Sequence, residues 1–160
     1  MENKKVIVTN MVNRRVGMTL PDLHFKRTWE KKGAKKPIDL EILEQAIYDP
    51  GVEYMFRQGI LAIDDMEVKK FLGLEPEDAT EPENIIILTD AQRKRYLTVA
   101  PISELKEIMK SISYEQRLEM ANYAIENNLD SVDRAEVIKS FTDIDVISAI
   151  RIKRQEKEGV

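Results

Sequence analysis

The sequence has no cysteine, and it has one tryptophan and one histidine in 160 residues. The absence of cysteine excludes disulfides, thiolate chemistry and any cysteine-built metal site, so a reducing compartment, or a particle assembled in one, is expected. No apolar run approaches the roughly 18 residues that span a bilayer. The opening residues, MENKKVIVTN, lack the apolar stretch of a secretory signal, and no membrane partner is predicted.

Motifs that specify a reaction are also scarce. The six glycines stand singly, whereas phosphate-binding loops cluster them beside a lysine. His24 is predicted to be an ordinary surface residue on the polar face of a strand. Asp64 and Asp65 are predicted to cap a helix, where a carboxylate is favoured. We therefore predict no enzyme activity, no cofactor and no metal, and keep an enzyme with a carboxylate site at Asp64, Asp65 and Glu67 as an alternative.

Charge is abundant but unevenly spread along the chain. Residues 1–37 carry 10 Lys/Arg against 3 Asp/Glu, residues 38–83 carry 3 against 13, and residues 84–160 carry 12 against 13. A basic end and an acidic middle can attract each other within one chain, pair head-to-tail between copies, or bind another protein.

Alternating apolar residues predict a small antiparallel β unit in the first third. Strands are expected at residues 6–9, 16–20, 23–29, 34–36 and 60–63, with Leu23, Phe25 and Trp29 facing inward. Asp39 is predicted to cap a helix, with Ile38 and Leu43 as a hydrophobic staple. The triplet at residues 49–51 is predicted to end that helix. A further short helix or a turn is expected at 51–59, and a short helix at 65–72 ends at Gly73.

The second half has helical periodicity. The acidic segment EPEDATEPE contains two prolines and is predicted to be a linker. Residues 85–88 are expected to form a buried strand or an apolar anchor. Helix caps are predicted at Thr89, Ser113, Ser131, and Thr142 or Asp143. The apolar residues expected to point inward are Leu105, Ile108, Met109, Ile112, Leu118, Ala121, Ile125, Ala135, Ile138, Phe141, Ile147 and Ile150.

These patterns predict an α+β chain. We expect a β-rich docking lobe with short helices at residues 1–74, an acidic linker at 75–84, and a helical bundle at 85–160.

Basic doublets near the first turns are the main binding signal. The tentative partner-binding residues are Lys31, Lys32, Lys35, Lys36, Arg14 and Arg15. Members of a doublet on a strand point to opposite faces, so the doublets are not expected to make one continuous stripe. Lys31, Lys32, Lys35 and Lys36 lie near a turn and could gather at one tip. Such a tip fits either a phosphate backbone or an acidic protein surface.

The stretch VTNMVNRRVGMTLPDLHFKRTW, followed by KKPIDLEILEQAIYDPGVEYMFRQGILAID, resembles the opening of small virion-associated proteins of tailed bacteriophages. The resemblance covers residues 4–74 and rests on a short strand, a V-x-N turn, an alternating strand through Pro-Asp, and a strand leading into a helix. It implies a non-enzymatic head-associated auxiliary or capsid-stabilising protein of the virion, assembled in the host cytoplasm. The implied partners are capsid or connector subunits, with self-association also open. The alternative is a nucleic-acid-binding accessory protein that uses the basic N-terminal third.

Overall fold

The computed structural model describes residues 4–158, which form two units that divide between Ile86 and Ile87. Strands and short helices make up the described part of the first unit, and helices make up that of the second. The predicted α+β class is confirmed. The acidic segment at 75–84, which was predicted to be a linker, lies within the first unit. The outer limits of the predicted lobes, residues 1 and 160, lie outside the described residues.

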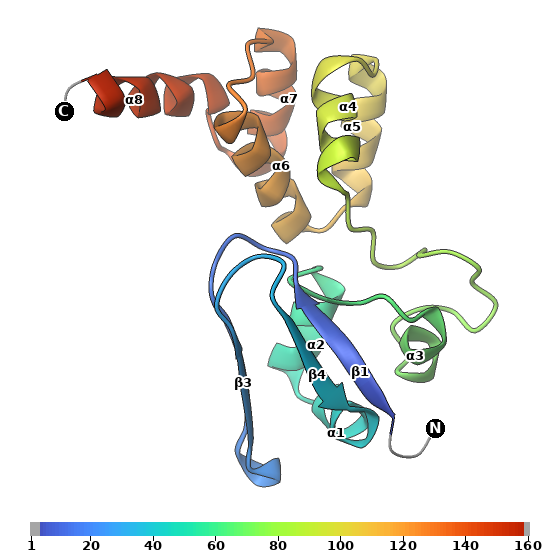
Figure 1. Ribbon diagram of the computed structural model, residues 1–160. Helices are drawn as coiled ribbons and strands as arrows, with labels where there is room; N and C mark the ends of the chain where they lie inside the picture. The colour runs from blue at the N-terminus through green and yellow to red at the C-terminus, as the bar shows by residue number, and fades with distance from the viewer. Residues whose placement is uncertain (1–3, 159–160) are drawn as a thin grey trace. The chain divides into compact units, whose positions relative to one another are not determined.

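The first unit contains two antiparallel sheets (Figure 1). The strands are β1 (Lys5–Asn10), β2 (Val16–Leu20), β3 (Phe25–Trp29), β4 (Lys35–Asp39) and β5 (Leu61–Ile63). In one sheet β1 lies between β4 and β5, and the other sheet is the β2–β3 hairpin. Val6 and Val8 are buried, whereas Ile7 between them is 49% exposed, so the predicted alternation is confirmed.

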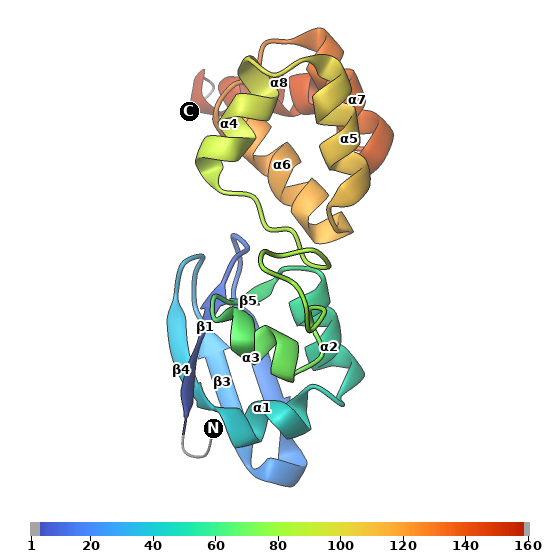
Figure 2. The same cartoon turned by 90° about the vertical axis from the view of Figure 1, so that its right-hand side faces the viewer.

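Short helices complete the first unit. They are the 3-10 helix η1 (Pro21–Leu23) and the α-helices α1 (Leu40–Ala46), α2 (Pro50–Arg57) and α3 (Met66–Phe71). Helices α1 and α2 lie on one face of β1 and β4 (Figures 1 and 2). Leu40, Leu43 and Phe56 bury their side chains in the core that this packing creates, together with Trp29 of the hairpin.

Several local predictions for the first unit need correction. Asp39 is the N-cap residue of α1 as predicted, but its carboxylate makes no capping hydrogen bond and instead pairs across the sheet with Lys5 at 2.5 Å. Asp49 opens α2 by accepting hydrogen bonds from the N–H groups of Gly51 and Val52, so this triplet starts a helix as well as ending one. The predicted strand at 23–29 is interrupted by η1, so His24 lies in a turn with φ of 49°. Its side chain is exposed, as predicted.

The second unit is helical. Its elements are α4 (Asp90–Thr98), α5 (Ile102–Ser111), α6 (Tyr114–Glu126), α7 (Val132–Thr142) and α8 (Val146–Glu158). Thr89 forms the predicted capping box with Gln92, and Ser113 and Ser131 cap α6 and α7 as predicted. The cap of α8 is Asp145, which accepts from the N–H of Ser148, because α7 ends with Asp143 in a left-handed conformation.

The buried face of the helical unit differs in part from the prediction. Leu118 and Ile125 of α6 are half-buried, and Met120 and Ala124 are buried in their place. Phe141 is also half-buried, with the Arg117 guanidinium 5.1 Å from its ring centre. Ile108 and Ile147 are half-buried too, whereas the remaining predicted inward residues are buried. Residues 85–88 form no strand, and Leu88 alone of the four is buried.

Candidate functional site

The main candidate site is an exposed group of cations at one end of the first unit. Two connections meet there, the β1–β2 connection at residues 11–15 and the β3–β4 connection at residues 30–34. Asn10 joins them, because its backbone oxygen accepts from the Gly33 N–H at 2.8 Å and its N–H donates to the Ala34 oxygen at 2.9 Å. Gly33 has φ of 85°, a conformation that glycine adopts without strain.

The Asn10 side chain also shapes the first of these connections. This side chain is buried; its amide nitrogen donates to the Arg14 oxygen at 2.7 Å, and its amide oxygen accepts from the Val12 N–H at 2.9 Å. One asparagine therefore fixes both the path of the β1–β2 connection and its position beside the β3–β4 connection. Such local side-chain to backbone bonds are typical of asparagine in turns.

Six cations lie in these two connections and at the start of β4, and together we call them the basic end. They are all exposed, and they are Arg14, Arg15, Lys31, Lys32, Lys35 and Lys36. Arg15 pairs with Glu30 at 3.4 Å, and the side chains of both residues are mostly in solvent. Within residues 4–158, no carboxylate lies within ion-pair distance of Lys31, Lys35 or Lys36. The basic end therefore keeps charge available for an external partner.

The expectation that the two cations of a doublet point to opposite faces of a sheet applies to only one of the three doublets of the basic end. Arg14–Arg15 and Lys31–Lys32 lie in the connections, where side chains do not alternate between the faces of a sheet. Only Lys35–Lys36, at the start of β4, follows strand alternation. The structure thus places two connections and one strand start together, which sequence spacing alone did not predict.

The aromatic residues beside these cations belong to the core instead. Trp29 is 0% exposed, and its ring nitrogen donates to the Val8 oxygen at 2.9 Å. Phe25 is also buried, as predicted, and the Arg27 guanidinium lies 4.5 Å from its ring centre. A tryptophan in this position cannot stack on nucleic-acid bases, so the stacking platform common in single-strand binding proteins is missing at Trp29.

A second charged surface follows α3. We call residues 75–84 the acidic loop. The Glu75 carboxylate is buried beneath this loop and accepts from the N–H groups of Glu83, Asn84 and Ile85 at 2.9 to 3.2 Å. Burial alone raises the pKa of Glu75, but these hydrogen bonds outweigh burial and hold the pKa below its usual range. Because Asn84 also bonds the Leu74 oxygen at 3.0 Å, the loop is closed at its base.

Asp64, Asp65 and Glu67, the carboxylates of the alternative enzyme site, do not form one site in the structure. Asp65 caps α3 by accepting from the N–H groups of Glu67 and Val68, which confirms the capping prediction. It also pairs with Lys4 at 2.6 Å, and this contact lowers the pKa of Asp65. Glu67 pairs with Lys70, and Asp64 is exposed. Across residues 4–158, no group of three or more such side chains is arranged to hold a metal ion.

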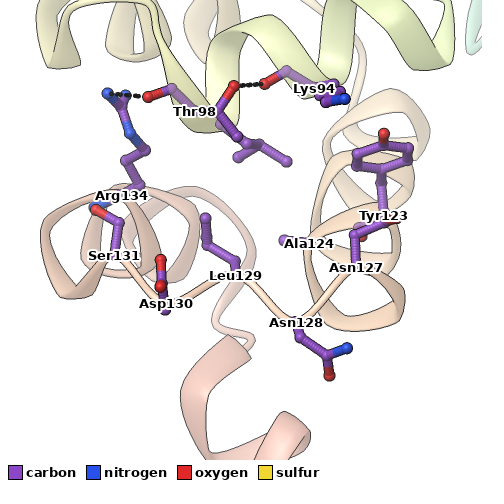
Figure 3. Close-up of a pocket in the computed structure, with 11 residues that line it drawn as sticks. Lys94, Thr98, Tyr123, Ala124, Asn127, Asn128, Leu129, Asp130, Ser131 and Arg134 are labelled. Carbon is purple, nitrogen blue, oxygen red and sulfur yellow. Dashed lines mark hydrogen bonds between the residues drawn. The ribbon is translucent and has the colours of Figure 1, made fainter.

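The helical unit contains a half-open cavity of about 590 Å³ (Figure 3). Leu97, Ala124 and Leu129 supply apolar lining, and polar groups surround them. Arg134 reaches across the cavity from α7 and donates to the Tyr96 and Thr98 oxygens at 3.2 and 3.3 Å. The guanidinium thereby satisfies carbonyls at the end of α4, so its first role is to join two helices.

Sequence reasoning did not find the residues that organise these sites. The sequence predicts no role for the Asn10 side chain, and it places Glu75 in a linker. Arg93 is 2% exposed, although arginine is seldom buried; it pairs with Asp90 at 2.9 Å and donates to Gln116 at 3.1 Å. The one available signal was Gly33 near a turn, which marks the place where the two connections meet.

Comparison with protein-family models, with curated proteins and with solved structures found no match for this chain. No helix within residues 4–158 combines the length and apolar character needed to cross a membrane.

Proposed function

We propose that this chain is a non-enzymatic structural protein of a bacteriophage virion, acting as a head-associated auxiliary or capsid-stabilising protein. The observation that carries the proposal is the basic end, which two connections hold together through Asn10. Within residues 4–158, three of its lysines have no carboxylate within ion-pair distance. The sequence resemblance over residues 4–74 supplies the virion setting, and those residues include the whole basic end.

The basic end suits a protein contact because its backbone is fixed before binding. Lys31, Lys35 and Lys36 project from a turn and a strand whose positions are set by backbone hydrogen bonds. Fixed charges of one sign select a partner surface of the opposite sign and set the register of docking. The buried Trp29 supports the rigidity of this unit and takes no part in the contact.

Mass spectrometry of purified particles tests the virion proposal, using the phage that encodes this chain. We expect the protein in a fixed ratio to the major capsid protein, after washing at moderate salt. If purified particles lack the chain altogether, the proposal is wrong.

A nucleic-acid-binding accessory protein is the second candidate, and the gathering of six cations at one end is the observation that favours it. Fluorescence anisotropy with labelled single- and double-stranded oligonucleotides distinguishes the two. Phosphate contacts predict affinity that falls steeply with salt and is lost when Lys31, Lys35 and Lys36 become glutamine. The virion proposal predicts no binding to either oligonucleotide at physiological salt.

A further inference from the structure

The acidic loop is the second charged surface of the first unit. Its exposed carboxylates are Glu77, Asp78, Glu81 and Glu83. Within residues 4–158, no cation lies within ion-pair distance of any of them. The buried Glu75 holds the base of the loop, so these carboxylates are carried on a closed segment rather than a loose one.

The basic end and the acidic loop do not neutralise each other within the first unit. One is formed by the connections around Asn10, and the other follows α3 (Figure 1). No ion pair joins them in the part of the chain that the structure describes. Lys4–Asp65 and Lys5–Asp39 do join the basic third to the acidic middle within one chain, but the basic end and the acidic loop themselves make no such pair. Both therefore keep charge for an external partner.

We propose that copies of this chain associate head-to-tail, with the basic end of one copy against the acidic loop of the next. This inference rests on the proposed structural role and names the partner of the basic end. Lys31, Lys35 and Lys36, which have no carboxylate within ion-pair distance in residues 4–158, would meet four carboxylates of the acidic loop, so the two groups match in sign and are similar in number. Because the two surfaces differ, the contact is heterologous and leaves both ends of a pair able to add further copies.

Three further observations support a second copy as the occupant. Both surfaces belong to the same unit, so every added copy presents them in the same relative geometry. The whole chain carries a net charge of only −4, so repulsion between copies is modest. Phe71, the last residue of α3, is 52% exposed and offers an aromatic contact for an arriving lysine or arginine.

Sedimentation velocity over a series of protein concentrations tests the inference on the purified full chain. We expect the weight-average sedimentation coefficient to rise with concentration at low salt. The rise should disappear at about 1 M salt, where the screening length is about 3 Å. A chain that stays monomeric at low salt up to millimolar concentration overturns the inference.

Charge-swapped variants identify the two surfaces. The basic-end variant is K31E/K35E/K36E, and the acidic-loop variant is E77K/D78K/E81K. Each should be monomeric alone: K31E/K35E/K36E leaves three cations beside three new carboxylates, which cancels the charge of the basic end, and E77K/D78K/E81K gives the loop the same sign as the basic end. An equimolar mixture should form pairs again, since the unchanged basic end of the loop variant meets the unchanged acidic loop of the basic-end variant. Failure of the mixture to associate, with both variants folded by circular dichroism, also overturns the inference.

Matched controls separate surface contacts from net charge. The controls change the same charges on other exposed residues and are K94E/K106E/K157E and E44K/E136K/E156K. Both should associate as the native chain does, and loss of association in both means that net charge rather than the named surfaces drives it. The particle measurement stays independent: copies that associate while particles lack the chain refute only the virion proposal.

Discussion

Replacing Glu75 with glutamine tests the structural basis of the acidic loop. The substitution keeps the size of the side chain but removes its charge and turns one acceptor oxygen into a donor. In the native chain both oxygens are used, because Oε1 and Oε2 together accept from three backbone N–H groups. In the variant, at least one of these N–H groups faces another donor.

The expected cost follows from these contacts. A hydrogen bond to a charged group contributes about 1.5–3 kcal/mol, and an orphaned buried donor costs about 1–3 kcal/mol. Loss of one such bond and weakening of the others would cost more, but the loop lies at the surface and its N–H groups can turn to water. We therefore expect the loop to be destabilised by about 2 kcal/mol, in the middle of these ranges.

Hydrogen exchange followed by mass spectrometry measures this effect directly. A change of about 2 kcal/mol corresponds to about thirty-fold faster exchange at the amides of Glu83, Asn84 and Ile85. Glu77→Gln is the matched control, because Glu77 is exposed in the same loop and should leave these amides unchanged. Native exchange rates at all three amides in the Glu75→Gln variant would refute the assigned role of the carboxylate.

The same variant gives a pH test. The pKa of Glu75 is lowered in the folded chain, because the backbone hydrogen bonds outweigh burial. A lowered folded pKa adds stability that is present above the unfolded pKa, about 4.3, and is lost as pH falls through the folded value. The native loop should therefore be better protected than the variant at neutral pH. The difference should shrink below about pH 4, and a constant difference down to pH 2 would contradict the linkage.

The remaining predictions concern packing and connections. Trp29→Phe should lower the free energy of unfolding by about 2–4 kcal/mol in urea titrations, because it removes buried ring volume and the bond to the Val8 oxygen; a loss below about 0.5 kcal/mol would contradict this. Asn10→Ala should cost about 2–3 kcal/mol, because the Val12 N–H loses its acceptor, whereas the exposed Asn13→Ala should cost less. Arg134→Met should cost about 1–2 kcal/mol in the helical unit, since the Tyr96 and Thr98 oxygens lose their donor; Lys94→Met is its control.

The parts of the fold that follow a simple period could be predicted from sequence. Alternation identified β1 and β2, and cap residues located the starts of α4, α6 and α7, because these signals depend on neighbours within four residues. The predictions failed where a distant partner decided the outcome. Asp39 occupies the N-cap position of α1 as predicted, but its carboxylate makes no capping hydrogen bond and pairs with Lys5 on the adjacent strand. Leu118 fits the helical stripe, but packing on both α7 and α8 turns α6 toward Met120 and Ala124.

The candidate surfaces were predictable in composition but not in arrangement. All six cations were identified from sequence, and their exposure follows from their chemistry. Their gathering depends on Asn10, which is distant in sequence from Gly33 and Ala34. The sequence predicts a linker at residues 75–84, because two prolines and several carboxylates favour an exposed, irregular segment. It failed because one of those carboxylates turns inward and accepts from the backbone.

The same physical device organises both charged surfaces, and this bears on how they work. In each case a buried polar side chain, Asn10 or Glu75, makes hydrogen bonds to backbone groups, and the neighbouring charged side chains point into solvent. Charges held by fixed backbone lose less conformational freedom on binding than charges on a mobile tail. Association should therefore depend on Asn10 and Glu75, although neither faces the partner. Asn10→Ala and Glu75→Gln should weaken it while the net charge of the basic end is untouched.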